Sequence, residues 1–387
     1  GCPFTCAFCL SSLEKGVRSF SRDRIRADIL KLVQKNIRVV KLVDRTFNYD
    51  PGRADEIWEF ILAHNESSTF HFEIAGDLLT DENFRTLAKV PHGMFRFEIG
   101  VQATGKETLS RVGRKSDTER LLANVKRLRE ETDVTIHLDL VAGLPGEDFQ
   151  GFLRSLECLF PLGPHHIQVE PLKVLKGSPM AGIAVREGYL FSDTPPYTIL
   201  RTPDLSFEEI GRIEEISRLL DLYYNSGRFT RSLGVAQAVI PPAVFFDRMA
   251  GFMKRESGTG QISLKGLFEL MERFAGEVVP VDTLDSFRDA LCYDFCLGEY
   301  PTTGSMPSFF PEEWKTSRIP VPRDSIDPIL AGMEKPAGSR VRAFAARFLN
   351  DYRTLPPAQG PVTLVFVYIS APGRGLRVEV FNLSAGA

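Results

Sequence analysis

Apolar positions follow two different periods along the first half of the chain. Short apolar runs typical of buried strands alternate with longer segments that place apolar residues every three or four positions, as amphipathic helices do. The predicted strands are 38–48, 69–79, 94–103, 134–147 and 165–175, and the predicted helices are 21–36, 51–65, 80–90, 117–132 and 147–160. This alternation predicts parallel βαβ units with right-handed crossovers. Functional residues are then expected where the strands end.

The pattern changes near residue 190. A segment rich in Pro and turn residues, 191–206, precedes helical spacing at 206–229, 262–276, 284–300 and 339–353. The last segment, 360–384, predicts a β-hairpin that turns at Pro372–Gly375. We therefore expect an α/β domain over 1–190, a mostly helical domain over 191–355 and a β-hairpin tail over 356–387.

Composition narrows the class of protein. The chain has 387 residues, 43% of them hydrophobic and 25% charged, which is typical of a globular protein. A formal net charge of −3 gives no general attraction to nucleic acid, so a nucleic-acid partner is not expected. No apolar run is long enough for a membrane helix. Six cysteines are too few for a disulfide scaffold, which predicts a reducing, cytoplasmic location. Because the sequence begins with Gly1 and not with an initiator Met, we expect a fragment of a longer protein.

Three of the six cysteines, Cys2, Cys6 and Cys9, lie within the first nine residues. A disulfide would use two of them and leave the third, and zinc would need a fourth ligand, although the nearest histidine, His64, is far along the chain. Thioredoxin-like chemistry would use only the Cys6–Cys9 pair. An iron–sulfur cluster bound by three thiolates would use all of them and leave one iron without a protein ligand.

The spacing C-x₃-C-x₂-C, with aromatic Phe8 before the last cysteine, resembles the signature of the radical S-adenosylmethionine (radical SAM) superfamily. This resemblance implies a partial (β/α)₆ barrel whose first strand is expected just before Gly1. It implies that Cys2, Cys6 and Cys9 bind a [4Fe–4S] cluster and that S-adenosylmethionine (SAM) chelates the open iron. Reductive cleavage of SAM then gives a 5′-deoxyadenosyl radical, with an electron donor such as flavodoxin or ferredoxin.

The resemblance also assigns SAM contacts. Glu73 in "FHFEIAG" matches the residue that binds the SAM ribose in coproporphyrinogen-dehydrogenase-like members. Gln102 and Arg114 match residues that bind the ribose and the SAM carboxylate, and a guanidinium suits a carboxylate. Each residue also has a structural interpretation: Glu73 and Glu98 can be ion-pair partners in a core, and Arg114 a surface charge.

Three further contacts follow from the same resemblance. Where many members carry Gly-Gly-Glu, this chain has "VDRTFN", in which Asp44 or backbone carbonyls are the candidates for the SAM amino group. Val141, with Asp139 beside it, matches a position that packs on adenine, although an apolar strand residue is buried in any case. Backbone near Leu172 matches the position that pairs with adenine. His137 is interpreted as a core histidine.

The segments "DRTFN", "HLDLVAGLPGED", "LKVLKGSP" and "YYNSGRF" together resemble a cobalamin-associated branch with a helical C-terminal domain. For the full-length protein this implies cobalamin and methyl transfer to a small-molecule or peptide substrate. A radical SAM oxidoreductase without cobalamin, a non-catalytic iron–sulfur or haem-trafficking protein and a zinc-stabilised module remain open. Cys292 and Cys296 are interpreted as buried helix thiols, and Cys158 is the only other spare thiol.

Overall fold

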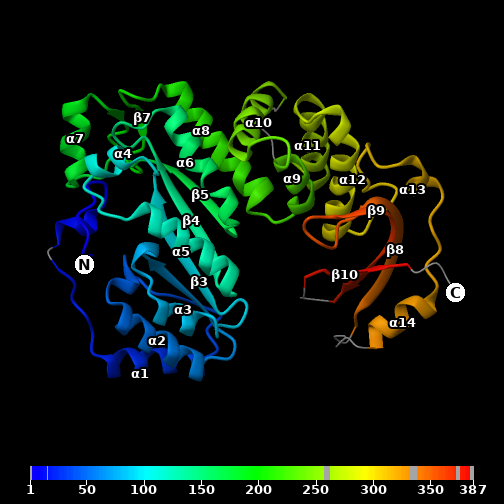
Figure 1. The fold of residues 1–387 in the computed structure, drawn as a ribbon, viewed down its shortest axis with the longest axis horizontal. Coiled ribbons are helices and arrows are strands. Elements are labelled where there is room, and N and C mark those ends of the chain that lie inside the picture. Colours follow the sequence, from blue (N-terminus) through cyan, green and yellow to red (C-terminus); the bar gives the residue numbers. More distant parts are fainter. Residues whose placement is uncertain (1, 15, 257–261, 332–337, 372–374, 384–387) are drawn as a thin grey trace. The chain divides into compact units, whose positions relative to one another are not determined.

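The computed structural model describes residues 2–14, 16–256, 262–331, 338–371 and 375–383. The chain divides into two compact units (Figure 1). The first comprises Gly1–Asn225 and Pro242–Ala250, and the second Ser226–Pro241 and Gly251–Ala387. The predicted domain boundary at residue 190 therefore falls inside the first unit, because the helix after it packs on the last strand of the parallel sheet.

A five-stranded parallel sheet forms the centre of the first unit. Its strands lie in chain order: β1 (Val39–Lys41), β2 (Thr69–Ile74), β3 (Phe95–Gln102), β4 (Thr135–Ala142) and β5 (His166–Pro171). This confirms the predicted α/β class and the five strands expected after the cysteine segment. Two short strands, β6 (Leu190–Phe191) and β7 (Ile199–Arg201), pair separately.

Helices follow the strands, as the βαβ prediction requires (Figure 1). They are α1 (Arg22–Gln34), α2 (Pro51–His64), α3 (Asp81–Leu87), α4 (Lys106–Arg111), α5 (Thr118–Glu131), α6 (Phe149–Glu157), α7 (Pro179–Glu187) and α8 (Phe207–Leu219). Two of these helices begin with a capping box. Thr80 forms a capping box at α3 and Ser206 forms one with Glu209 at α8. The π-helical turn η5 (Leu220–Tyr224) continues α8, and α10 spans Pro242–Glu256.

The two faces of the parallel sheet differ in chemistry. Every second residue of β2, β3 and β4 is buried, and Trp58 of α2 lies 6.2 Å from Phe72 and 5.4 Å from Phe97 between ring centroids. The opposite face is less buried and carries Glu73, Glu98 and His137 side by side in the strand register. Because strand side chains alternate, burial of the aromatic face fixes the direction of these polar groups.

The second unit combines helices with an antiparallel sheet. Its helices are α9 (Thr230–Gln237), α11 (Leu264–Val278), α12 (Val281–Gly298), α13 (Glu312–Thr316) and α14 (Arg323–Ala331), and its strands are β8 (Arg340–Asp351), β9 (Ala358–Ser370) and β10 (Arg377–Asn382). The sheet order is β10-β9-β8. Pairing of β9 with β10 confirms the terminal hairpin, whereas residues 372–374 of its predicted turn lie outside the described residues.

One predicted helix is wrong. Residues 339–353, whose three alanines and four arginines favour a helix, form strand β8 over most of their length. This strand pairs with β9 over eleven positions, with Phe344 opposite Phe366. Alternate residues face opposite sides, since Phe348 contacts Trp314 while Ala345 joins a separate apolar cluster with Val365. Tertiary pairing therefore overrides the local helix preference.

Candidate functional site

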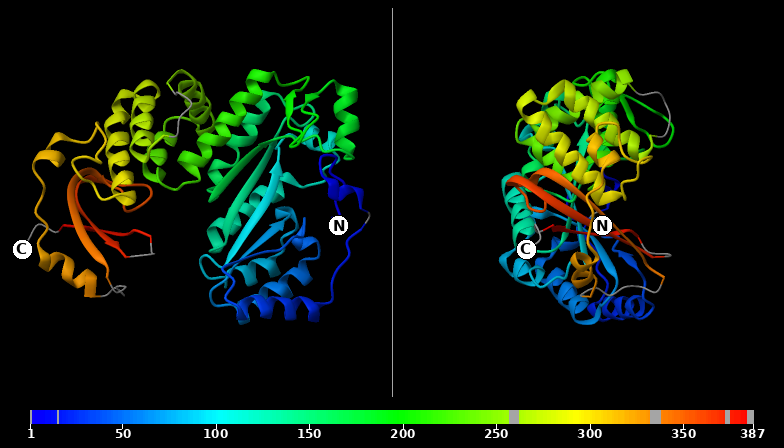
Figure 2. Two further views of the ribbon diagram at one scale, coloured as in Figure 1. Left: turned by 180° about the vertical axis from the view of Figure 1, so that it is seen from behind. Right: turned by 90° about the vertical axis from the view of Figure 1, so that its right-hand side faces the viewer.

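The cysteine segment is fixed to two other parts of the first unit. The amide of Ala7 donates to the carbonyl of Val112 at 2.8 Å, and the amide of Met180 donates to the carbonyl of Ala7 at 2.9 Å. Figure 2 shows this segment beside helix α7 in the view from behind. Cys6 is buried and Cys2 and Cys9 are half-buried. Phe8 is half-buried in the turn before Cys9.

The surroundings of Cys6 shift the pKa of its thiol. Burial raises the pKa of Cys6, Arg114 lowers it, and negative charge on Cys2 or Cys9 raises it again. The Arg114 Nη1 atom lies 3.7 Å from Cys6 Sγ and can donate to it. Among the described residues, no three His, Cys, Asp or Glu side chains are placed to bind a single metal ion. In an iron–sulfur cluster, by contrast, each thiolate binds its own iron.

A cavity of about 180 Å³ opens at the carboxyl ends of the parallel strands. Its residues come from the cysteine segment, from the ends of β2, β3 and β4, from the loop after β1 and from the segment after α4. They are Phe4, Arg45, Thr46, Glu73, Ile74, Ala75, Glu98, Gly100, Gln102, Arg114 and Asp139. The structure therefore brings together three of the predicted SAM contacts: Glu73, Gln102 and Arg114.

Three polar atoms of this cavity are buried without a hydrogen-bond partner: Gln102 Oε1, Arg114 Nε and Asp139 Oδ1. Leaving such an atom unpaired costs about 1–3 kcal/mol. Three such atoms in one cavity therefore indicate a site that would bind a polar ligand. Gln102 also has a φ of 71°, in the left-handed region that glycine favours. A Cβ at position 100 would collide with Gln102 Nε2, so a larger residue there would displace this amide group.

Glu73 and Glu98 are two carboxylates that lie opposite each other on neighbouring strands. Lys41 Nζ lies 3.8 Å from Glu73 and 3.4 Å from Glu98, Arg45 Nη1 lies 3.4 Å from Glu73, and His71 Nε2 lies 2.9 Å from Glu98. Burial lowers the pKa of His71, and the Lys41 charge lowers it further. The positive charges of Lys41 and Arg45 compensate the two adjacent carboxylates, so Glu73 and Glu98 can both line one cavity.

The other predicted contacts are placed differently. Asp44 is exposed and is not among the cavity residues, which instead include its neighbours Arg45 and Thr46. Leu172 is buried, and its backbone groups are already paired, with the amide bonded to Ala142 at 2.9 Å and the carbonyl to Ile199 at 3.0 Å. Val141 is half-buried, two residues after Asp139 on the same strand face.

Sequence reasoning missed Thr46 as a site residue. Its position within "DRTFN", in the loop after β1, was the available signal, because the loops that follow parallel strands converge at one edge of the sheet. His137, interpreted as a core histidine, is partly exposed and stacks on His166 at 4.7 Å between ring centroids. Burial lowers the pKa of His137 to about 3, so this ring is neutral at physiological pH.

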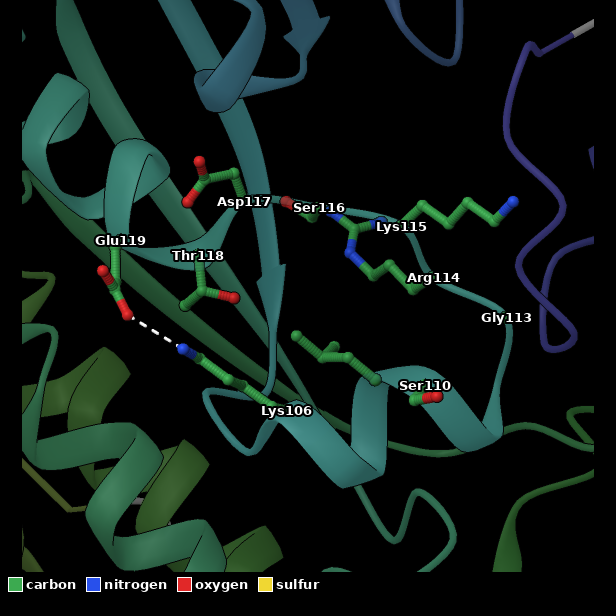
Figure 3. A pocket seen from close by; sticks show the side chains of 10 residues that line it. Lys106, Ser110, Gly113, Arg114, Lys115, Ser116, Asp117, Thr118 and Glu119 are labelled. Carbon is green, nitrogen blue, oxygen red and sulfur yellow. Dashed lines mark hydrogen bonds and ion pairs between the residues drawn. The ribbon is translucent and has the colours of Figure 1, made fainter.

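A second hollow lies next to Arg114 and is lined by residues of the segment 106–119. Figure 3 shows the ammonium group of Lys115 extending away from the guanidinium of Arg114. Lys106 Nζ and Glu119 Oε1 form an ion pair at 2.9 Å across this hollow. Arg114 is the residue that lines both hollows, whereas Lys115 lines only this one.

The other three cysteines lie away from this site in the chain. Cys292 and Cys296 are buried in α12, and burial raises the pKa of both thiols. Tyr368 donates to the Cys296 carbonyl at 2.7 Å. Cys158 is exposed at the end of α6. The burial of Cys292 and Cys296 agrees with their interpretation as helix thiols.

Comparison with known families identifies the first unit. Residues 1–159 match the family model of the Radical SAM superfamily. This match identifies residues 1–159 as a radical SAM domain. Residues 187–320 match a second family, described as a protein of unknown function (DUF4080). The helices of the described residues include none with the length and apolar content that a membrane span requires.

Curated relatives align with part of the chain. Oxygen-independent coproporphyrinogen III oxidase of Helicobacter pylori is 28% identical over 183 residues, covering 43% of this chain and 39% of that protein. tRNA-2-methylthio-N(6)-dimethylallyladenosine synthase of Herpetosiphon aurantiacus is 23% identical over 168 residues, covering 41% and 38%. The chain thus spans about two fifths of the length of these relatives.

Solved structures resemble the chain in fold. The cobalamin-dependent S-adenosylmethionine radical enzyme OxsB, with aqua-cobalamin bound, has a TM-score of 0.46 at 12% identity, covering 76% of this chain and 52% of that one. Coproporphyrinogen III oxidase (HemN) from Escherichia coli, described as a radical SAM enzyme, has a TM-score of 0.39 at 19% identity, covering 57% and 50%.

Asp139 gives the cavity of the radical SAM domain a measurable pH dependence. Burial, with the charges of Glu98 and Glu73, raises its pKa from 3.8 to about 8. The folded chain therefore retains this proton up to about pH 8, and stability is lost as the pH rises from about 4 to 8. Replacing Asp139 with Asn should remove that loss, which for a pKa raised from 3.8 to about 8 amounts to ~5 kcal/mol in the free energy of unfolding between pH 4 and pH 8.

Urea unfolding of the metal-free chain at both pH values measures this difference. Asp133→Asn is the control, because Asp133 is exposed just before the same strand. An identical pH dependence in wild type and Asp139→Asn would show that Asp139 ionises normally in the folded chain.

Proposed function

We propose that this chain binds a [4Fe–4S] cluster and SAM and cleaves SAM reductively. Cys2, Cys6 and Cys9 would bind the cluster, and Glu73, Gln102 and Arg114 would bind SAM. The observation that carries the proposal is the set of three unpaired buried polar atoms in a cavity that Arg114 connects to the Cys6 thiol. When bound, the cluster supplies one electron that splits the SAM sulfonium into methionine and a 5′-deoxyadenosyl radical.

The residues of the cavity have separate tasks in this proposal. Arg114 presents a guanidinium to the SAM carboxylate, a pairing in which charge strengthens both hydrogen bonds. Glu73, placed by Lys41 and Arg45, accepts from ribose hydroxyls. Gln102, at the end of β3, offers an acceptor that has no hydrogen-bond partner in the part of the chain that the structure describes. The aromatic face of the sheet excludes water from behind the cavity.

A more specific proposal concerns the reaction of the full-length protein. In its full-length form, the protein would use cobalamin as a methyl carrier and transfer a methyl group from SAM to its substrate. Support comes from "DRTFN", "HLDLVAGLPGED" and "LKVLKGSP", which resemble the cobalamin-associated branch. An oxidoreductase acting without cobalamin would share the same SAM site and would form no S-adenosylhomocysteine.

Anaerobic reconstitution of the protein with iron and sulfide tests the proposal. We expect about four iron and four sulfide per chain, the content of one [4Fe–4S] cluster. Addition of SAM should change the electron paramagnetic resonance (EPR) spectrum of the reduced cluster, because SAM binds the open iron. S-adenosylhomocysteine formed only with cobalamin would favour methyl transfer. Bound zinc without sulfide would contradict the proposal.

A further inference from the structure

The loop after β1 is held in one position by buried contacts. Asn48 is fully buried, and its side chain both donates to the Ala75 carbonyl and accepts from the Ala75 amide, each at 2.8 Å. Phe47 packs against Phe72 at 4.7 Å and against Trp58 at 5.8 Å between ring centroids. Thr46 directly precedes these anchors, so the loop fixes the position of its hydroxyl group.

The Thr46 hydroxyl lies between two acceptors. Its Oγ1 atom is 2.8 Å from the Arg45 carbonyl and 3.4 Å from Cys2 Sγ, and Thr46 is only 6% exposed. A hydroxyl has one proton to donate. While Cys2 is a thiol, its S–H can donate to Thr46 and the hydroxyl can donate to Arg45. As a cluster ligand Cys2 is a thiolate, which only accepts and which attracts the hydroxyl proton through its charge.

We propose that Thr46 is a positioning residue that donates a hydrogen bond to the Cys2 thiolate and raises the reduction potential of the cluster. The inference rests on the proposed function. Reduction adds negative charge to the cluster, so a donor to one of its sulfurs stabilises the reduced state more than the oxidised state. Arg114 Nη1, 3.7 Å from Cys6 Sγ, is a second donor of this kind from a different segment.

An EPR-monitored redox titration of the reconstituted protein tests the role of Thr46. Thr46→Val removes the hydroxyl while keeping the shape of the side chain. At a fixed potential, the ratio of reduced to oxidised cluster should fall about tenfold, equivalent to a midpoint lower by ~59 mV for a one-electron couple. Thr46→Ser keeps the hydroxyl and should keep the wild-type midpoint.

Thr69→Val is the matched control, because Thr69 donates to the Gly93 carbonyl at the amino end of β2. An unchanged midpoint in fully loaded Thr46→Val, or an equal shift in Thr46→Ser, would overturn the inference. Thr46→Ala serves as a second hydroxyl-free variant. Loss of the cluster from both hydroxyl-free variants, but not from Thr46→Ser or Thr69→Val, would support action of the hydroxyl on Cys2.

Iron and sulfide analysis of each sample separates this inference from the proposed function. Wild-type protein without a cluster would refute the proposed function and the inference together. Wild-type protein with a full cluster, combined with a Thr46→Val midpoint equal to that of wild type, would refute the inference alone.

Discussion

Replacing Cys6 with Ala should remove the cluster and lower the rate of 5′-deoxyadenosine formation from SAM by ~100-fold or more. This is equivalent to an activation free energy that is higher by ~2.7 kcal/mol. Cys6 is the buried member of the three thiols, and Arg114 contacts its sulfur. Two remaining thiolates cannot bind three irons, so the cluster should be lost rather than weakened. Iron and sulfide content, the absorbance of the cluster and mass spectrometry of the product measure these effects.

Cys158→Ala is the control for this substitution. It removes one thiol from the same unit, and Cys158 is exposed at the end of α6. It should retain wild-type iron, sulfide and product. A Cys6→Ala variant with a full cluster and wild-type product would remove Cys6 from the ligand set, whereas equal losses in the two variants would indicate a general effect of thiol removal.

Replacing Arg114 with Gln should weaken SAM binding about 30-fold, the ratio that ~2 kcal/mol for a charge-assisted hydrogen bond gives. The guanidinium of Arg114 is the cationic group placed between the Gly100 carbonyl and Cys6 Sγ, and its Nε atom is buried without a partner. Glutamine keeps a donor for the Gly100 carbonyl but lacks the charge and the planar fork that suit a carboxylate. Anaerobic calorimetric titration with SAM measures the affinity.

Lys115→Gln removes the same charge from the next residue and is the matched control. Its ammonium extends away from Arg114 (Figure 3), and Lys115 is not among the residues that line the cavity at the carboxyl ends of the parallel strands. Affinity for SAM should stay within about twofold of wild type, since a surface charge contributes at most ~1 kcal/mol and is screened by salt. A similar loss in both variants would mean that Arg114 acts only through general charge.

The sequence predicts most of the parallel sheet well because β2, β3, β4 and β5 each contain an apolar alternate set. In β2 and β3, Phe70, Phe72, Phe95 and Phe97 must be buried, and this requirement fixes both strand type and facing. Strand β8 lacked such a signal. Its residues Ala343, Ala345 and Ala346 suit a helix equally well, and only pairing with β9 makes them a strand.

The site was predictable where covalent spacing or strand position determines chemistry. The spacing of Cys2, Cys6 and Cys9 predicts the proposed ligand set, and the resemblance of the strand-end motifs assigns Glu73 and Gln102, which line the cavity. In the loop after β1, tertiary contacts determine which side chains point into the cavity. The anchoring of Asn48 on Ala75 places Arg45 and Thr46 at the cavity and leaves Asp44 exposed, and no local pattern encodes this choice.

Leu172 illustrates a different limit. Sequence resemblance places it near adenine, but whether its backbone groups are free depends on pairing with other segments. In the structure, its amide and carbonyl are bonded to Ala142 and Ile199. Such hydrogen-bond accounting requires the positions of all neighbouring strands.

The most direct test of the account is detection of 5′-deoxyadenosine by mass spectrometry after anaerobic incubation of the reconstituted protein with SAM and a strong reductant. The account predicts 5′-deoxyadenosine and methionine in wild-type protein, dependent on the reductant and absent from Cys6→Ala. The contrary result is intact SAM after incubation with a fully loaded, reduced cluster whose EPR spectrum shows SAM bound. That result would contradict reductive cleavage and favour a protein that binds SAM without cleaving it.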